Sequence, residues 1–295
     1  MDIQSRGDKI FHFFNNFVMF LLLFITLYPF WYTFAISFND GTDALRGGIY
    51  FWPRVFTLDN YRAVFQNRNL INGFIVSISR TVVGTFVFVL FTGMVAFAMS
   101  KNYLKFRKLY MTIGVITLFF SGGLIPYFLL IRDLGLRNNF LVYIIPNMFG
   151  FWNMVIMMTF FKQLPSELSE SAEIDGAGDV RIFLSIILPL SKPILATMAL
   201  FHGVFQWNEF FSAVLFIDSQ ALLPIQTILF RIVAEAEAHT MLAQVNLPDI
   251  VAQRRLTSQS VTLATMVVTT VPIILVYPFL QKYFVKGMLI GSVKG

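Results

Sequence analysis

Carboxylate side chains gather in one polar stretch, Lys162 to Ser191, in the middle of a chain that is otherwise mostly apolar. The stretch lies between two apolar runs of membrane-spanning length. Because charged groups avoid lipid, so many carboxylates in one place must face water. We therefore interpret the stretch as a docking element for a partner in water. Its acidic residues are Glu167, Glu170, Glu173, Asp175 and Asp179.

Side chains that commonly carry catalysis or bind metals are scarce in this chain. It contains no cysteine, which excludes a disulfide framework, a thiol nucleophile and a thiolate metal site. His12, His202 and His239 are far apart in the sequence. The phosphate-binding pattern G-x-x-x-x-G-K-[ST] is missing, so the chain cannot hold ATP in that way. The sequence thus predicts no catalytic residue, no metal site and no bound cofactor.

Four polar or amphipathic residues in a row interrupt a later apolar run and are candidates for a solute pathway. They are Gln206, Trp207, Asn208 and Glu209. Tryptophan and asparagine together suit a sugar, because they offer an apolar ring face and a hydrogen-bonding edge. Ionisable groups inside a membrane are costly and usually face a bundle interior or water. One alternative stays open: these side chains make interhelical hydrogen bonds or lie near the outer interface.

Arg80 lies too deep in an earlier apolar run for its side chain to reach the membrane surface easily. It could attract acidic sugars, but we prefer the interpretation that it pairs with Glu209 or with backbone carbonyl groups. Glu209 would repel an acidic sugar unless it is paired or protonated, which favours a structural or gating role over direct binding. Tyr127, Trp152 and Asn153 are further candidates for the pathway.

The composition places these residues in an integral membrane protein. The 295 residues are 57% hydrophobic and only 13% charged, whereas soluble domains have roughly 25% charged residues. The mean hydropathy is +0.70. Apolar runs of about 20 residues predict transmembrane helices, so we expect an all-α membrane protein in which residues 1–295 form a single domain. The six predicted spans cover approximately residues 13–38, 71–99, 109–131, 140–161, 193–217 and 259–280.

Six spans place both chain ends on the same side of the membrane. Short loops rich in Lys and Arg stay in the cytoplasm, and the loop after the second span carries Lys101, Lys105, Arg107 and Lys108. We therefore expect both termini and the acidic stretch to be cytoplasmic. The net charge of +6 then serves to orient the protein in the membrane and does not indicate a nucleic-acid partner.

The acidic stretch has start and stop signals for two short helices. Pro165-Ser166-Glu167 predicts a helix start, because proline fits the first turn and acids suit the helix dipole. Asp175-Gly176 predicts its end, since glycine adopts the left-handed conformation without penalty. We expect a second helix from Asp179 that Pro189 and Pro193 end, before the fifth span begins. The alternative is an ordinary solvated loop with helical segments.

The same stretch resembles the EAA signature of ABC-importer permeases. The matching pattern is Glu170-x-Ala172-x-x-Asp175-Gly176-Ala177, followed by Phe183, Ile186, Leu188-Pro189 and Pro193. Ser171 departs from the usual alanine, but both residues are small. The resemblance implies the type I importer permease fold, with a cytoplasmic coupling helix that sits in a cleft of an ATPase subunit. It implies ATPase-coupling roles for Glu170, Ala172, Asp175, Gly176, Ala177, Phe183 and Pro189.

Other motifs extend the resemblance over the whole chain. The carbohydrate branch of these permeases, which includes the smaller subunit of the maltose permease, is similar to this chain in several places. The nearest resemblance is to permeases for fragments of alginate and pectin. The family's C-terminal tail reaches the ATPase subunits, which implies a second contact at Gly291, Ser292 and Lys294. The matching motifs are Gly48-x-Tyr50-x-Trp52-Pro53, Phe120-Ser121-Gly122-Gly123, Trp207-Asn208 and Tyr277-Pro278-Phe279-x-Gln281-Lys282-Tyr283.

The resemblance implies a permease subunit of a bacterial ABC importer, in the inner (cytoplasmic) membrane, for an oligosaccharide such as an acidic one. Its expected partners are a second permease subunit, two ATPase subunits, an extracytoplasmic solute-binding protein and the lipid bilayer, with no nucleic acid. The ATPase subunits would bind ATP and magnesium, so the chain itself is not expected to be an enzyme. The alternative is a stand-alone secondary transporter or channel for a small solute, which needs a relay of membrane-buried charges.

Overall fold

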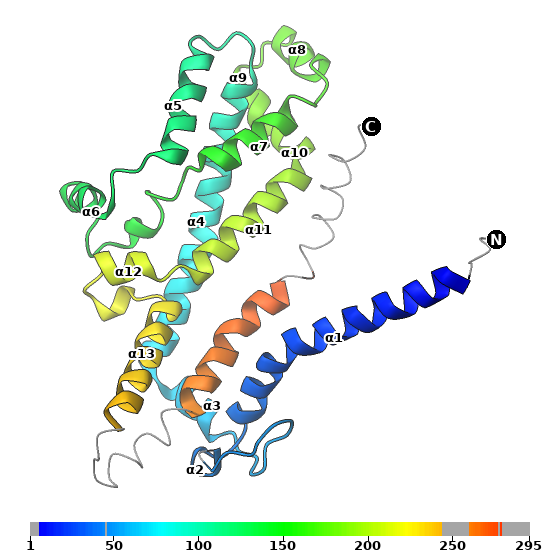
Figure 1. Ribbon diagram of the computed structural model, residues 1–295. Coiled ribbons are helices and arrows are strands. Elements are labelled where there is room, and N and C mark those ends of the chain that lie inside the picture. The colour runs from blue at the N-terminus through cyan, green and yellow to red at the C-terminus, as the bar shows by residue number, and fades with distance from the viewer. Residues whose placement is uncertain (1–5, 45, 244–259, 277, 279–295) are drawn as a thin grey trace. The chain divides into compact units, whose positions relative to one another are not determined.

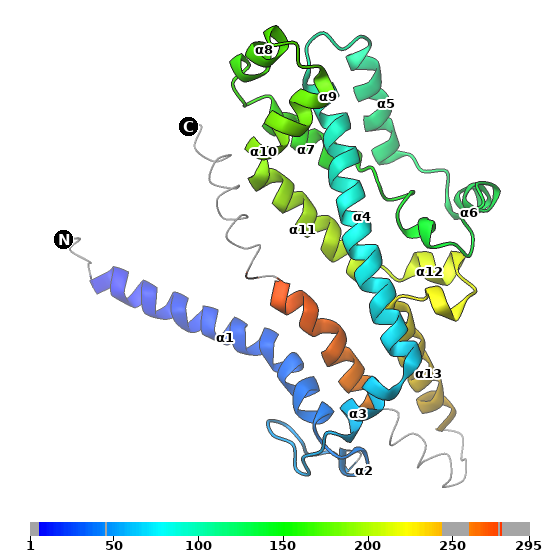
Figure 2. The same ribbon diagram turned by 180° about the vertical axis from the view of Figure 1, so that it is seen from behind.

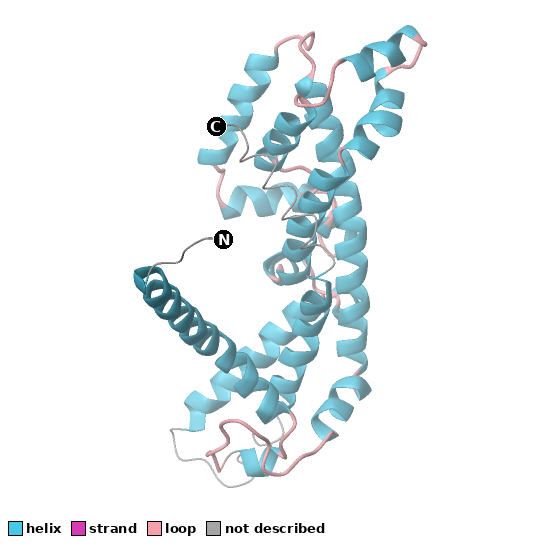
Figure 3. Cartoon of the chain, turned by 90° about the vertical axis from the view of Figure 1, so that its right-hand side faces the viewer, coloured by secondary structure: helices cyan, strands magenta, loops and turns pink. Residues whose placement is uncertain are grey.

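The computed structural model describes residues 6–44, 46–243, 260–276 and 278. Within these residues the regular secondary structure is helical, and Asn39 and Phe56 form an isolated antiparallel bridge. Figure 3 accordingly shows helices joined by loops. The predicted all-α class is confirmed. The predicted tail contact at Gly291, Ser292 and Lys294 lies outside the described residues.

The chain divides into two compact units. The first comprises Met1–Arg68 and Arg231–Thr270, and the second comprises Asn69–Phe230 and Val271–Gly295. The first unit contains α1 (Arg6–Ser37), α2 (Gly41–Ala44), α3 (Asp59–Gln66) and most of α13 (Ile225–Ala243). The helix Ser260–Val276 begins in the first unit and ends in the second.

The loop between α1 and α3 is ordered by one buried asparagine. The Asn39 side chain accepts the backbone N–H groups of Arg54 and Val55 and donates to the Asp43 carboxylate. At the start of α3, the Thr57 hydroxyl accepts the N–H of Asp59 at 3.1 Å. This bond satisfies one of the free amides of the first helical turn. The α3 helix begins at Asp59, two residues after Thr57.

The second unit is built around α4 (Arg68–Ser100), which runs along it in Figures 1 and 2. Shorter helices follow in chain order, several of them joined at sharp bends. They are α5 (Arg107–Phe119), α6 (Leu124–Asp133), η1 (Phe140–Tyr143), α7 (Phe151–Phe161), α8 (Glu167–Ile174), α9 (Asp179–Ile182), η2 (Phe183–Ile187), α10 (Leu188–Leu190), α11 (Lys192–Asn208), α12 (Phe211–Phe216) and η3 (Gln220–Leu222).

Two helices among the described residues are long and apolar enough to cross a bilayer, Gly7–Ser37 and Arg68–Ser100. Two bent pairs qualify if each counts as one span: α5 with α6, bent by 118°, and Asp179–Leu190 with α11, bent by 86°. The first bend falls at the motif Phe120-Ser121-Gly122-Gly123, where Gly123 has φ +84°. The α7 helix has only 11 residues, too few to span alone. The six-span topology therefore remains a prediction.

Two apolar clusters hold the second unit together, one at each end of α4. The first packs Phe97 and Met99 of α4 against α7 and against Phe183 of η2. The second packs Val76 of α4 against α6, η1 and α12. The first cluster positions the acidic stretch, and the second positions the polar side chains around Arg80.

Candidate functional site

The acidic stretch folds into two helices joined by a tight turn, which we call the elbow (residues 167–182). After α8, Gly176 adopts φ +82°. Its N–H donates to the Glu173 carbonyl at 3.0 Å, and the Ala177 N–H donates to the Ala172 carbonyl at 2.8 Å. This pair of bonds is the Schellman arrangement that closes a helix at a left-handed residue. The predicted glycine stop is confirmed.

The helix after the turn ends between Pro189 and Pro193, as the two prolines predict. Helical structure continues from Asp179 to Leu190, and the bend of 86° falls between Leu190 and Lys192. Residues Phe183–Ile187 form a π-helical segment directly before Leu188 and Pro189. A proline lacks the N–H for the usual i−4 bond and crowds the preceding turn. The helix accordingly ends at Leu190, one residue after Pro189.

The predicted coupling residues face two different ways. Glu170 and Asp175 are exposed, as the docking prediction requires. Ala172 and Ala177 pack against the first apolar cluster. Phe183 is buried, with its ring centroid 5.6 Å from that of Phe97 on α4. Glu170 and Asp175 therefore lie on the outer surface of the elbow, whereas the apolar residues of the signature attach it to the rest of the chain. Pro189, the remaining member of the set, is exposed.

Sequence reasoning missed two residues that contact the elbow from the loop between α4 and α5. Lys101 Nζ lies 3.3 Å from Glu173 Oε1. The Tyr103 hydroxyl donates to Asp179 Oδ1 at 2.8 Å. The sequence analysis explains the positive charge of this loop by membrane topology alone. The available signal was that a basic loop and the acidic stretch are both expected on the same side of the membrane.

Arg80 belongs to a polar network at the C-terminal end of α11. Its side chain is fully buried. Nη2 lies 2.8 Å from Glu209 Oε2, and Nη1 donates to the Glu209 carbonyl at 2.9 Å. Nε and Nη2 both donate to Gln206 Oε1 at 3.1 Å. The guanidinium carbon also lies 4.2 Å from the centroid of the Tyr143 ring. The preferred interpretation, in which Arg80 pairs with Glu209, is confirmed.

Glu209 lies at a break between two helices, inside the apolar run of residues 193–217 that the sequence predicts as the fifth span. The α11 helix ends at Asn208, and α12 begins at Phe211. Glu209 Oε1 accepts the N–H of Ser212 at 2.7 Å, which satisfies a free amide in the first turn of α12. On the other side of the network, Gln206 Nε2 donates to the Tyr143 carbonyl at 2.9 Å. The network thus ties α4, η1 and the break between α11 and α12 together.

The predicted pathway residues do not converge on one surface. Arg80, Gln206 and Glu209 form the network, and the first two are fully buried. Asn208 is exposed and donates to the Val204 carbonyl of its own helix. The other candidates lie elsewhere in the second unit. Tyr127 is on α6, Trp152 and Asn153 are on α7, and Trp207 lines a separate cavity.

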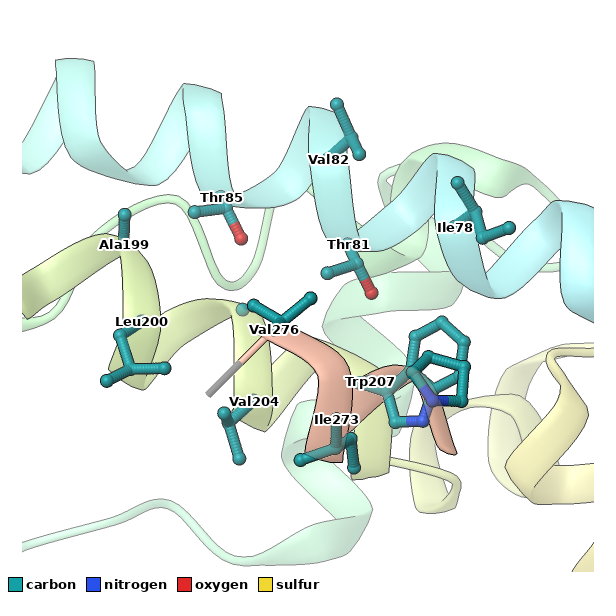
Figure 4. Close-up of a pocket in the computed structure, with 12 residues that line it drawn as sticks. Ile78, Thr81, Val82, Thr85, Ala199, Leu200, Val204, Trp207, Ile273 and Val276 are labelled. Carbon is teal, nitrogen blue, oxygen red and sulfur yellow. The ribbon is translucent and has the colours of Figure 1, made fainter. Parts of the chain in front are cut away.

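That cavity, of about 360 Å³, lies between α4, α11 and the end of the helix Ser260–Val276. Its lining is almost entirely apolar. Thr81 and Thr85 of α4 are the exceptions, and their hydroxyl oxygens are buried with no hydrogen-bond partner among the described atoms. Figure 4 shows both threonines on the side of α4 that faces α11, with Trp207 at one end. Trp207 itself is buried and packs near Phe74.

Replacing Trp207 by alanine is expected to lower the free energy of unfolding by about 3–5 kcal/mol, the usual cost of removing a buried tryptophan. Trp152→Ala is the matched control, because Trp152 is 64% exposed and Trp207 only 6%. Thermal unfolding in detergent measures both variants. If Trp207→Ala unfolds like Trp152→Ala but loses uptake, Trp207 acts in the solute pathway and not in packing.

The fold and the elbow define a class: an all-α membrane protein with an exposed acidic elbow between its apolar helices. Residues 2–290 match the family described as "Binding-protein-dependent transport system inner membrane component". The chain belongs to this family of ABC-importer permeases, as the EAA-like stretch indicated.

Relatives cover nearly the whole chain. Protein LplC of Bacillus subtilis is 41% identical over 92% of this chain and 90% of its own length. The polygalacturonan/rhamnogalacturonan transport system permease protein YtcP of the same organism is 38% identical over 94% and 96%. A crystal structure of a bacterial ABC transporter involved in the import of the acidic polysaccharide alginate contains a chain with a TM-score of 0.85 and 29% identity. That match covers 96% of this chain and 100% of the other. The predicted type I permease fold is confirmed.

Proposed function

We propose that this permease subunit carries an acidic oligosaccharide across the bacterial inner membrane, with both termini and the elbow in the cytoplasm. A second permease subunit would complete the pathway, two ATPase subunits would dock below, and an extracytoplasmic binding protein would deliver the solute. ATP and magnesium would bind to the ATPase subunits. The observation that carries the coupling role is the elbow, whose glycine turn presents Glu170 and Asp175 to solvent.

The substrate class rests on two relatives. One is named for transport of polygalacturonan or rhamnogalacturonan, and the other imports the acidic polysaccharide alginate. Polygalacturonan is a polymer of galacturonate, so both names indicate sugars that carry carboxylates. Arg80 is a poor candidate for binding those carboxylates directly, because it is fully buried and neutralised by Glu209. Its role in this proposal is to hold the break between α11 and α12 in place.

The elbow moves as a rigid piece in the proposed cycle. Closure of the ATPase subunits around ATP would displace α8, and the apolar attachment through Ala172, Ala177 and Phe183 would carry that displacement into the helices. The helices would then switch the pathway between inward-open and outward-open arrangements. Each state must bind the solute or its delivery protein differently for the cycle to move solute in one direction.

Uronate oligomers are expected to stimulate ATP hydrolysis by the reconstituted complex several-fold, and neutral oligosaccharides of the same length are expected to have little effect. The measurement is the hydrolysis rate in proteoliposomes that contain both permeases, the ATPase and the binding protein. Equal stimulation by a neutral maltooligosaccharide would remove the acidic specificity. Uptake driven by an ion gradient without any ATPase would favour the alternative of a secondary transporter.

A further inference from the structure

The short loop that connects α4 to α5, residues 101–106, contacts the elbow on both sides of its glycine turn. Before the turn, Glu173 of α8 pairs with Lys101 at 3.3 Å. After the turn, Asp179 at the start of α9 accepts the Tyr103 hydroxyl at 2.8 Å. Gly176 lies between these two acids in the sequence. Both helices of the elbow are therefore fastened to one loop.

The lysine is held in place from several directions. Its side chain is only 15% exposed, compared with 46% for Glu173. Nζ lies 4.8 Å from the centroid of the Phe97 ring and 5.8 Å from that of the Tyr103 ring. An ammonium group at this range is attracted by the electron-rich face of a ring. Lys101 therefore joins the last turn of α4, the loop and α8 in one contact.

The tyrosine is a proton donor at neutral pH. Desolvation, the hydrogen bond to Asp179 and the charges of Asp179 and Glu173 raise the pKa of the Tyr103 hydroxyl to about 12. A group with a raised pKa keeps its proton up to higher pH. The hydroxyl therefore donates to the Asp179 carboxylate throughout the physiological range.

These polar contacts lie beside the apolar attachment. Phe97, whose ring the Lys101 ammonium group contacts, packs on Phe183 of η2. An apolar contact resists separation but has little directional preference, whereas a hydrogen-bonded pair fixes orientation. The elbow is therefore both held against α4 and prevented from rotating about the Phe97–Phe183 contact.

We propose that Lys101 and Tyr103 are positioning residues that tie both helices of the elbow to the cytoplasmic end of α4, so that a displacement of the elbow moves α4 with it. This inference rests on the proposed coupling function of the elbow. The α4 helix carries Arg80 in its other half. The elbow and the buried network are thus connected by one continuous helix.

The test compares Lys101→Met and Tyr103→Phe in the complete reconstituted complex with ATPase, partner permease and binding protein. Tyr103→Phe keeps the ring and removes only the hydroxyl. Lys105→Met is the control, because it removes a charge from the same loop at an exposed position. The readouts are co-purification of the ATPase, the ATP hydrolysis rate, and solute taken up per ATP hydrolysed.

The complex is expected to assemble and hydrolyse ATP in every variant. Uptake per ATP is expected to fall about fivefold in the Lys101→Met, Tyr103→Phe double variant, because two partly exposed polar contacts are lost together. Lys105→Met is expected to transport normally. Exchange of the charged pair, Lys101→Glu with Glu173→Lys, is expected to restore most of the coupling that either single reversal removes. A role in folding alone would lower yield and leave the uptake per ATP of the surviving protein unchanged.

Two failures can be told apart. If the unmodified chain never associates with an ATPase, the proposed function itself fails. If the unmodified complex couples hydrolysis to uptake and the double variant couples equally well, only the positioning role of Lys101 and Tyr103 is overturned.

Discussion

Replacing Gly176 by proline is expected to abolish solute uptake while leaving the chain in the membrane. Gly176 has φ +82°, and a proline ring fixes φ near −65°. Proline also lacks the N–H that donates to the Glu173 carbonyl at 3.0 Å. The elbow would have to open to accept the new residue, at a local cost of about 3 kcal/mol or more. That cost reduces the population of the native turn roughly 100-fold.

The effect is expected at the coupling step, because the substitution changes the backbone and not the neighbouring side chains. Among the described residues, no heavy atom beyond Gly176 and its two chain neighbours lies within 4 Å of a Cβ placed on Gly176. The measurements are ATPase co-purification and uptake in proteoliposomes. The control is Gly178→Ala, since Gly178 has an ordinary φ of −74° and equally open surroundings. Normal uptake by Gly176→Pro beside normal uptake by the control would remove the elbow from the mechanism.

The elbow could be predicted from the sequence because local chemistry specifies it. A glycine after an acidic helix and a proline before it act within a few residues of themselves. The prolines after the second helix also act locally, and that helix ends at Leu190, between Pro189 and Pro193. Local rules do not, however, predict the π-helical segment that precedes Pro189. The π-helical segment at Phe183–Ile187 is supported by burial of Phe183 and Ile187 in the first apolar cluster. That support depends on residues of α4 and α7, which no local pattern contains.

The ion pair between Arg80 and Glu209 could also be predicted from the sequence, but from the cost of a buried charge and not from a local pattern. A charge inside a membrane needs a partner, and the two apolar runs offered Arg80 and Glu209. The sequence did not reveal the contributions of Gln206 and Tyr143, which come from three-dimensional proximity alone. It also did not reveal that the helix ends at Asn208, because Gln-Trp-Asn contains no glycine or proline.

The contacts of Lys101 and Tyr103 were missed because they join residues 72 and 76 positions apart. Membrane topology already explains the positive charges of this loop, so the sequence gives no separate indication that they contact the elbow.

The predicted spans show a limit of hydropathy analysis. Hydropathy identifies apolar runs, but not whether a run forms one straight helix, as α4 does, or a bent pair, as α5 and α6 do.

Replacing Arg80 by methionine is expected to lower the free energy of unfolding by about 3–5 kcal/mol, the usual cost of removing one partner of a buried pair. The Glu209 side chain is only 12% exposed, so its carboxylate would be left without a cation in a nearly water-free environment. Gln206 would also lose two donors to its side-chain oxygen. Thermal unfolding of the purified chain in detergent measures the loss.

A second variant separates the ion pair from simple packing. When Arg80→Met is combined with Glu209→Gln, no charge is left without a partner. The amide oxygen that the second substitution introduces can still accept the Ser212 N–H, which the Glu209 carboxylate accepts in the native chain. This double variant is therefore expected to be at least about 1 kcal/mol more stable than Arg80→Met alone.

The matched control is Arg137→Met, which breaks a 3.0 Å pair with Asp218 whose side chains are 49% and 66% exposed. Exposed pairs contribute roughly 0–1 kcal/mol, so this loss is expected to be small. If Arg80→Met costs no more than Arg137→Met, or if the double variant is no more stable than the single one, the buried network does not hold the break between α11 and α12. The helix ends there would then be maintained by the second apolar cluster, in which Ala213 and Phe216 of α12 pack against η1 and α6.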